Sequence, residues 1–230
     1  MRKLSRVFYK PNNTFQSVKI KICGLAQPQN IAEVIKAQAD WVGFIFYSPS
    51  PRWIEKTSPD LIFFQQMKEV KKVGVFVNAS FDEVRQKVKN YTLDYVQLHG
   101  DESVEYCQTL YQENFKLIKV FRIQDTFISP TIIQEYEPFV DFFLFDTQTK
   151  QYGGSGHVFD WQLLTDYRSA KPMIVGGGLN PDNLEKLLTF IREKKLPIAV
   201  IDLNSGVEIE PAFKDIEKVK KSVKMIRLYS

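Results

Sequence analysis

The chain has 230 residues, of which 44% are hydrophobic and 25% charged, and its formal net charge is +4. This composition excludes a disordered chain and fits one large domain, because α/β barrels of about 200–250 residues form single domains. The basic clusters lie far apart in the sequence and lack interleaved aromatic residues, which argues against nucleic-acid binding and leaves a mild attraction for anionic metabolites.

Targeting, membrane and metal signals are weak in this sequence. Residues 1–17 have no apolar region and no small-residue cleavage site, so they do not form a secretory signal, and we assign this extension no role. No apolar run approaches the roughly 18 residues of a membrane span. Cys23 and Cys107 are too far apart for a disulfide framework, and His99 and His157 lack metal-ligand spacing. We therefore expect a cytoplasmic protein with no membrane association and no metal.

Short apolar runs alternate with amphipathic stretches along the chain. Strands are predicted over 18–23, 41–46, 73–77, 95–99, 115–121, 141–146, 173–176 and 198–202. Helices are predicted between and after them, over 28–39, 59–70, 80–90, 101–111, 127–136, 159–164, 181–194 and 215–226. Eight such units predict an α/β protein with a (β/α)8 TIM barrel over residues 18–230, as a single domain. An open doubly wound sheet is the alternative.

Chemically reactive side chains stand at the ends of several predicted strands. Because side chains alternate along a strand, the apolar residues pack under the helices and the polar ones turn inward or to the barrel mouth. The side chains placed there are Lys21, Cys23, Gln97, His99, Asp146 and Asp202. A purely structural barrel gives little reason for a thiol, an imidazole and two carboxylates at one face. A hydrogen-bonded polar layer without catalytic function is the simpler alternative.

Glycine-rich segments follow three of the predicted strands. The segment 153–156 comes soon after Asp146 and can bring bare backbone close to a substrate. Glycines at 176–178 follow the seventh strand, and Ser205 and Gly206 follow the eighth. Loops after these two strands form a recurrent phosphate site in (β/α)8 barrels. We therefore expect a small phosphorylated ligand, held by backbone N–H groups of Gly177, Gly178, Ser205 and Gly206.

Taken together, these motifs closely resemble the phosphoribosylanthranilate isomerases of tryptophan biosynthesis. The matching stretches are 18–25, 41–46, 50–52, 73–78, 96–100, 146–147, 152–156, 159–161, 177–181, 202 and 205–208. The resemblance spans roughly residues 18–226, in the right order throughout. The chain departs from the family pattern at Ala212, where the family usually has glycine, at His157 and at Asn204. If position 212 needs a positive φ, alanine costs about 1 kcal/mol there.

The resemblance implies an Amadori rearrangement of N-(5-phosphoribosyl)anthranilate to 1-(2-carboxyphenylamino)-1-deoxyribulose 5-phosphate, without a cofactor. It implies Cys23 as the base, with Lys21 favouring the thiolate, and Asp146 as the acid. Arg52 is expected to hold the anthranilate carboxylate. The other expected substrate-binding residues are His99, Asp202, Gly154, Gly177, Gly178, Ser205 and Gly206. The expected assembly is a monomer or a homodimer.

Two other functions compete with this interpretation. A barrel related to indole-glycerol-phosphate synthase would carry inward Lys and Glu residues as its acid and base. A degenerate barrel that only senses a phosphorylated metabolite would have lost Cys23 or Asp146. Both residues are present, which favours the isomerase.

Overall fold

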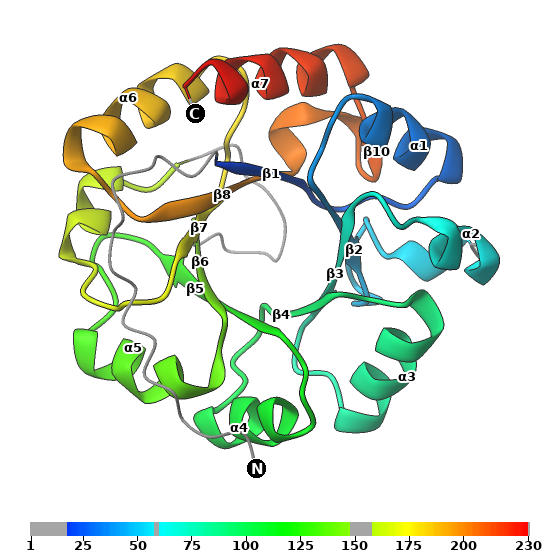
Figure 1. Cartoon of the computed structure of the whole chain (residues 1–230), viewed down its shortest axis with the longest axis horizontal. Helices are drawn as coiled ribbons and strands as arrows, with labels where there is room; N and C mark the ends of the chain where they lie inside the picture. Colours follow the sequence, from blue (N-terminus) through cyan, green and yellow to red (C-terminus); the bar gives the residue numbers. More distant parts are fainter. Residues whose placement is uncertain (1–17, 58–59, 148–157, 230) are drawn as a thin grey trace.

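The computed structural model describes residues 18–57, 60–147 and 158–229. Eight parallel strands close into a barrel in chain order, and helices surround it (Figure 1). The strands are β1 Lys19–Ile22, β2 Trp41–Ile45, β3 Lys71–Phe76, β4 Tyr95–Leu98, β5 Leu117–Ile123, β6 Phe142–Thr147, β7 Met173–Val175 and β8 Ile198–Leu203. The closing pair is β1 with β8, in which Lys21 is in register with Asp202. The predicted (β/α)8 barrel is confirmed, and the open sheet is excluded.

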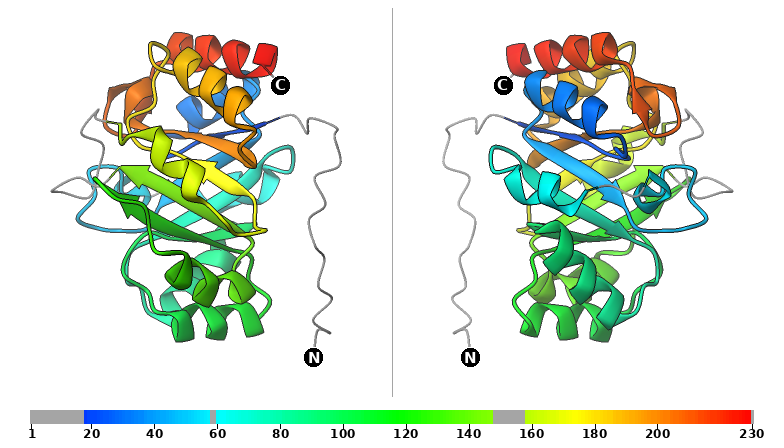
Figure 2. Two further views of the ribbon diagram at one scale, coloured as in Figure 1. Left: turned by 90° about the vertical axis from the view of Figure 1, so that its left-hand side faces the viewer. Right: turned by 90° about the vertical axis from the view of Figure 1, so that its right-hand side faces the viewer.

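The helices form the outer layer, as both side views show (Figure 2). The α-helices are α1 Pro28–Lys36, α2 Leu61–Gln66, α3 Phe81–Tyr91, α4 Val104–Gln112, α5 Pro130–Tyr136, α6 Leu184–Lys194 and α7 Ile216–Tyr229. The 3₁₀ segments are η1 Ile54–Thr57, η2 Glu137–Phe139, η3 Trp161–Asp166 and η4 Ser205–Val207. None of the helices in the described ranges is long and apolar enough to cross a membrane.

Local capping explains where the observed helices differ from the predicted ones. The side chain of Asp60 accepts a hydrogen bond from the Ile62 N–H, and Met67 is extended, so the helix predicted over 59–70 shortens to α2. Ser103 caps α4 in the same way, which moves its start from 101 to Val104. Ser80 caps α3 likewise, since its side chain accepts from the Glu83 N–H.

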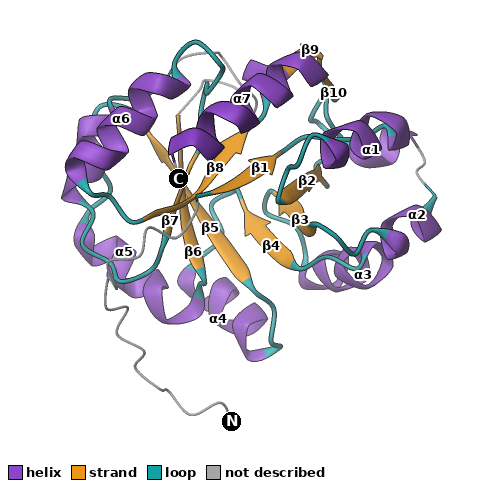
Figure 3. Ribbon diagram, turned by 45° about the horizontal axis from the view of Figure 1, so that its top comes forward, coloured by secondary structure: helices purple, strands orange, loops and turns teal. Residues whose placement is uncertain are grey.

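An antiparallel hairpin absent from the sequence prediction follows β8. Its strands are β9 Glu208–Glu210 and β10 Phe213–Lys214, and it lies outside the barrel near α1 and α7 (Figure 3). Pro211 and Ala212 form its turn, and Ala212 has φ +69°. A proline followed by a residue with positive φ is the arrangement of a type II turn, where glycine is preferred. The condition under which Ala212 would be strained is therefore met.

Two apolar clusters build the core. The larger one fills the space between the strands and the helices, and it includes Ile20 and Ile22 of β1 and Phe143 and Phe145 of β6. The smaller one lies inside the barrel, where Trp41 stacks on Tyr95 with 4.7 Å between the ring centroids. Its other buried members are Val73, Ile118, Val120, Leu144, Ile174 and Val200. Alternation thus distributes the side chains as predicted, with polar residues above this inner cluster.

Candidate active site

A continuous chain of polar side chains crosses the carboxyl-terminal end of the barrel. Lys21 is fully buried, and its Nζ donates to Gln97 Oε1 at 2.8 Å and to Asp202 Oδ2 at 2.7 Å. Gln97 Nε2 lies 3.2 Å from His99 Nδ1. The other ring nitrogen of His99 lies 3.4 Å from Asp146 Oδ2. Strands β1, β4, β6 and β8 therefore bring together five of the polar residues that strand alternation placed inside the barrel.

Cys23 follows β1 at the same end of the barrel and is only 4% exposed. Gly43 on β2 makes room for it, because a Cβ at position 43 would lie 2.7 Å from the Cys23 sulfur. Burial raises the pKa of the thiol, and the positive charges of Lys21 and Lys214 lower it by less. Lys21 thus acts in the predicted direction, but burial outweighs it and the thiol form is favoured.

Asp146 lies at the end of β6, which is separated from β1 around the barrel by β7 and β8. Its Oδ1 accepts from the Thr147 N–H at 2.7 Å, which fixes one edge of the carboxyl group. Gly177 packs directly beside it, since a Cβ at position 177 would lie 2.7 Å from the same oxygen. The side chain remains about a quarter exposed, so Asp146 is accessible from the barrel mouth.

Arg52 and Lys214 share one buried carboxylate, that of Glu208. Arg52 donates to it from Nε and Nη2, with the shortest distance 2.7 Å, and Lys214 Nζ lies 2.7 Å from Glu208 Oε1. Burial alone would raise the pKa of Glu208, but the two cations outweigh it and lower the pKa. Among the described residues no hydrogen bond uses Nη1 of Arg52, so both of its hydrogens are available to a ligand. Arg52 also lies beside Gly24, because a Cβ there would come within 2.7 Å of its Cδ.

The loops after β7 and β8 meet as the phosphate-site prediction requires. Gly177 and Gly178 have φ values of +85° and +64°, which favour glycine. A Cβ on Gly206 would lie 2.8 Å from the Asn180 Cβ, so only a glycine allows the two loops to pack this closely. No hydrogen bond within the described part of the chain uses the N–H groups of Gly177, Gly178, Ser205 or Gly206. These donors are available to an anion.

Lys214 beneath the β8 loop was missed by the sequence analysis. Its Nζ donates to the carbonyl and side-chain oxygens of Asn204 at 3.2 and 2.8 Å, and its backbone pairs with Asn30. Burial lowers the pKa of Lys214 to about 8, against the opposing charge of Glu208. Nothing in the sequence around Lys214 signals this role, because its partners come from other parts of the chain.

Two predicted features lie apart from this cluster. Gly154 and His157 fall outside the described residues, so the glycine-rich segment after Asp146 stays a prediction. Cys107 is fully buried on α4 in the outer core, and burial raises the pKa of its thiol to about 12. Cys107 therefore belongs to the packed core, away from the barrel mouth.

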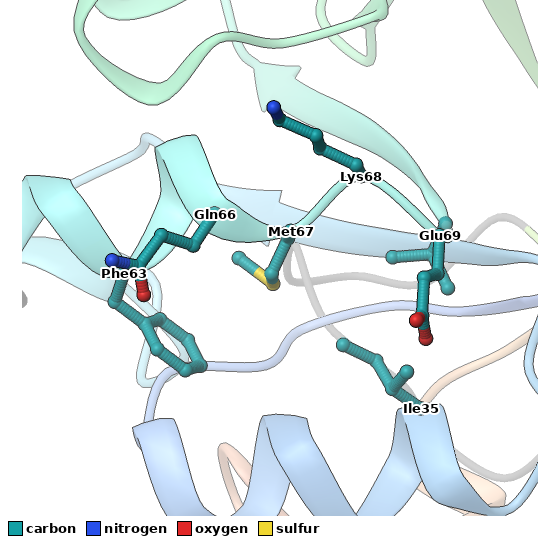
Figure 4. A pocket seen from close by; sticks show the side chains of 7 residues that line it. Ile35, Phe63, Gln66, Met67, Lys68 and Glu69 are labelled. Carbon is teal, nitrogen blue, oxygen red and sulfur yellow. The ribbon is translucent and has the colours of Figure 1, made fainter.

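A cavity of about 460 Å³ lies between α1 and the segment that leads from α2 into β3 (Figure 4). Its lining residues are Ile35, Phe63, Gln66, Met67, Lys68, Glu69 and Val70. Because residues 67–70 precede the first residue of β3, this cavity opens at the amino-terminal end of the strands. Active sites of (β/α)8 barrels lie at the other end, so we place the candidate site at the mouth that holds Cys23 and Asp146.

The sequence matches known proteins over nearly its whole length. A family model described as N-(5'phosphoribosyl)anthranilate (PRA) isomerase matches residues 20–225. The N-(5'-phosphoribosyl)anthranilate isomerase of Parabacteroides distasonis is 46% identical over 211 residues, covering 90% of this chain and 92% of that protein. The same enzyme of Phocaeicola vulgatus is 39% identical, covering 90% and 97%.

Solved structures agree with these matches. The Thermotoga maritima phosphoribosyl anthranilate isomerase superposes with a TM-score of 0.75 at 31% identity, covering 91% of this chain and 98% of that one. A second structure, of a phosphoribosyl anthranilate isomerase in complex with reduced 1-(o-carboxyphenylamino)-1-deoxyribulose 5-phosphate, gives 0.74 at 29% identity with the same coverage. With the family model covering residues 20–225, the chain belongs to the N-(5'-phosphoribosyl)anthranilate isomerase family.

Proposed function

We propose that this protein isomerises N-(5'-phosphoribosyl)anthranilate to 1-(2-carboxyphenylamino)-1-deoxyribulose 5-phosphate in tryptophan biosynthesis. One observation carries the proposal beyond family membership. A buried thiol and an accessible carboxyl group, Cys23 and Asp146, end two different strands at the mouth of one closed barrel. The rearrangement needs a base and an acid at separate atoms of one substrate, and this arrangement supplies both.

In the proposed mechanism, Asp146 donates a proton to the ribose ring oxygen, and the C1′–O bond breaks to give an iminium ion. Cys23, as the thiolate, then removes the proton from C2′, and the electron pair of that C–H bond forms the enamine. Tautomerisation of this enol-amine gives the ketone product without any net oxidation. Because burial raises the pKa of Cys23, the thiolate is a strong base once it forms.

Two sets of donors are proposed to bind the substrate at its two charged ends. The free edge of Arg52 would hold the anthranilate carboxylate, because Glu208 already fixes the plane of its guanidinium group. The phosphate would lie on the unused N–H groups of the β7 and β8 loops. His99 and Gly154 remain proposed substrate contacts.

Asp202 is the proposed contact for a ribose hydroxyl. Its Oδ2 accepts from Lys21, but its buried Oδ1 has no hydrogen-bond partner among the described residues. A buried acceptor without a partner is costly, and a substrate hydroxyl donating to Oδ1 would satisfy it.

Loss of fluorescence during turnover of N-(5'-phosphoribosyl)anthranilate tests the reaction directly. We expect turnover by the wild-type chain, with inorganic phosphate competing against substrate. Binding without turnover would favour the metabolite sensor and contradict the proposal. The synthase alternative requires an inward lysine, and Lys21 is one. Its Nζ, however, already donates hydrogen bonds to Asp202 and Gln97. Turnover of 1-(2-carboxyphenylamino)-1-deoxyribulose 5-phosphate to an indole product would establish that alternative.

The remaining expectations concern the cellular location, the domain organisation and the oligomeric state of the enzyme. We propose a cytoplasmic protein whose residues 18–230 form one catalytic domain, with residues 1–17 as an extension of unassigned role. One similar structure, at 28% identity and a TM-score of 0.73, is of monomers generated from the dimeric Thermotoga maritima enzyme. Either a monomer or a homodimer is therefore compatible with this fold, and sedimentation equilibrium distinguishes them.

A further inference from the structure

The polar chain that crosses the barrel fixes the direction of each of its hydrogen bonds. Lys21 has no acceptor atom, because an ammonium group only donates. Its Nζ lies 2.8 Å from Gln97, so the oxygen of the Gln97 amide must face Lys21. The NH₂ group of Gln97 then faces the imidazole of His99, at 3.2 Å. The reversed amide would place two donors against each other.

Lys21 is a dependable donor in this arrangement. It is fully buried, and its second partner is the Asp202 carboxylate at 2.7 Å. Burial alone would lower the pKa of Lys21, but the charge of Asp202 and the neighbouring Cys23 outweigh it, so the pKa is raised. The ammonium form therefore persists through the pH range in which an enzyme of this family would work.

The orientation of Gln97 determines the tautomer of His99. An NH₂ group can only donate, so Nδ1 of His99 must accept and carries no hydrogen. The imidazole proton is then on Nε2, the atom 3.4 Å from Asp146 Oδ2. An imidazolium would carry hydrogens on both nitrogens, and its Nδ1–H would oppose the Gln97 NH₂ group. An imidazolium in this place would therefore lose the hydrogen bond to Gln97.

The charged groups around His99 come from four other strands. Asp146 on β6 is the nearest carboxylate, and Asp202 on β8 interacts with the imidazole electrostatically. Lys21 on β1 acts through Gln97. Arg122 on β5 is in register with Asp146, and it donates to Asp101 in the loop after β4. Lys21 is thus paired with Asp202 and Arg122 with Asp101, so Asp146 is the carboxylate that faces the imidazole among the described residues.

We propose that Gln97, oriented by Lys21, is a positioning residue that holds His99 as a neutral Nε2–H imidazole beside Asp146. This assignment deepens the proposed function, because its consequence for catalysis rests on Asp146 being the acid. A neutral imidazole can orient the carboxyl group by donating one hydrogen bond. An imidazolium at the same distance would favour the carboxylate anion and oppose the protonated form that an acid needs.

The tautomer can be measured in the resting enzyme without any assay of activity. The sequence contains two histidines, His99 and His157, so ¹⁵N-histidine labelling gives two imidazole spin systems, and His157→Gln identifies the one from His99. Long-range ¹H–¹⁵N correlation is expected to show His99 with an unprotonated Nδ1 and a protonated Nε2 at neutral pH. An Nδ1–H tautomer, or an imidazolium, would overturn the proposal.

Gln97→Glu reverses the constraint with almost no change of shape. A carboxylate at position 97 can still accept from Lys21, and its second oxygen can accept from Nδ1–H of His99. We expect His99 to become an imidazolium at neutral pH, kcat to fall about tenfold or more, and the inflection of the pH–kcat profile that reports Asp146 to move about one pH unit or more to lower pH. If the Gln97→Glu variant folds and its His99 is an imidazolium, but its pH–kcat profile is unchanged, the proposed role of Gln97 is contradicted.

Gln97→Met is the matched control, because it removes the amide and adds no charge. It should give a mixture of His99 tautomers and a lower kcat, with the Asp146 inflection unmoved. If the pH–kcat profile of Gln97→Met shifted as far as that of Gln97→Glu, the cause would be lost packing and not the added charge. That result would overturn the proposal. If the wild-type enzyme has the expected tautomer but no isomerase activity, the proposed function fails while the tautomer assignment stands.

Discussion

Lys214 and Glu208 form a buried ion pair beneath the loop that follows β8, with Nζ and Oε1 2.7 Å apart. Through this pair, one carboxylate connects two parts of the site. Glu208 orients the guanidinium group of Arg52, while Lys214 holds the backbone and side chain of Asn204. The proposed carboxylate and phosphate contacts of the substrate therefore depend on the same buried network.

The pH dependence of stability should reveal the buried Lys214. Burial lowers its pKa to about 8 in the folded protein, from 10.5. Between these values the unfolded chain binds a proton that the folded protein does not, so the free energy of unfolding rises with pH in this window. The stability contribution is fully present above pH 10.5 and is lost as pH falls through about 8. Its size is about 3 kcal/mol.

The comparison with Lys214→Met isolates this contribution, because all other groups, including Cys23, titrate in both proteins. We expect the wild type to gain stability relative to Lys214→Met between pH 7.5 and pH 10, measured by urea unfolding at each pH. A stability difference that is constant with pH would show that Lys214 keeps its charge throughout this range.

Substitution of the proposed acid or base should reduce turnover without weakening binding. Cys23→Ser and Asp146→Asn are each expected to lower kcat by about 10²–10⁴-fold, the usual contribution of a positioned acid or base. KM should change little, because neither side chain makes the main binding contacts. The pH–kcat profile of the wild type should be bell-shaped, because turnover needs Cys23 deprotonated and Asp146 protonated. Because burial raises the pKa of the thiol, only a minor fraction of Cys23 is thiolate at neutral pH.

Cys107→Ser is the matched control for the thiol, because Cys107 is equally buried but lies in the core under α4. Its kcat should stay close to that of the wild type. Alkylation of the native enzyme should inactivate it through Cys23, and substrate should protect. If Cys107→Ser loses as much turnover as Cys23→Ser, or Asp146→Asn turns over normally, the assignment is wrong.

Arg52→Ala should raise KM by about 10–100-fold, as expected for the loss of a charge-assisted hydrogen bond to the anthranilate carboxylate. Arg52→Lys keeps the charge but loses the planar pair of donors, so an intermediate KM is expected. Both variants should remain folded, since Glu208 still has Lys214 as a partner. Thermal unfolding serves as the check on the fold, and an unchanged KM would remove Arg52 from the binding site.

Ala212→Gly should stabilise the protein by about 1 kcal/mol, because alanine is strained at φ +69° and glycine is not. Urea unfolding at fixed pH measures the difference. Ala170→Gly is the control, since Ala170 is exposed and is not among the residues with positive φ. That substitution should destabilise the protein by a few tenths of a kcal/mol or more, because glycine makes the unfolded chain more flexible. Equal effects at the two positions would contradict local strain at Ala212.

The sequence by itself determined the barrel and the side chains at its mouth. Hydrophobic periodicity is a local property, and eight repeated strand–helix units leave few compact arrangements. Alternation within a strand is also local, so it placed Lys21 and Gln97 inside the barrel without reference to their partners. The helix ends were less accurate where a side-chain cap decided them, as at Asp60 and Ser103.

Only the tertiary structure decided which of these groups meet and in what state. Lys21 and Asp202 are 181 residues apart in the chain, and the register of β1 with β8 brings them together. Lys214 joins the site only because the β9–β10 hairpin folds back beneath the β8 loop. The pKa of Cys23 depends on how burial compares with the charges of Lys21 beside it and of Asp202 and Lys214 from the far end of the chain. Proton positions and pKa values arise from the three-dimensional environment, because desolvation and charge act through space and not along the chain.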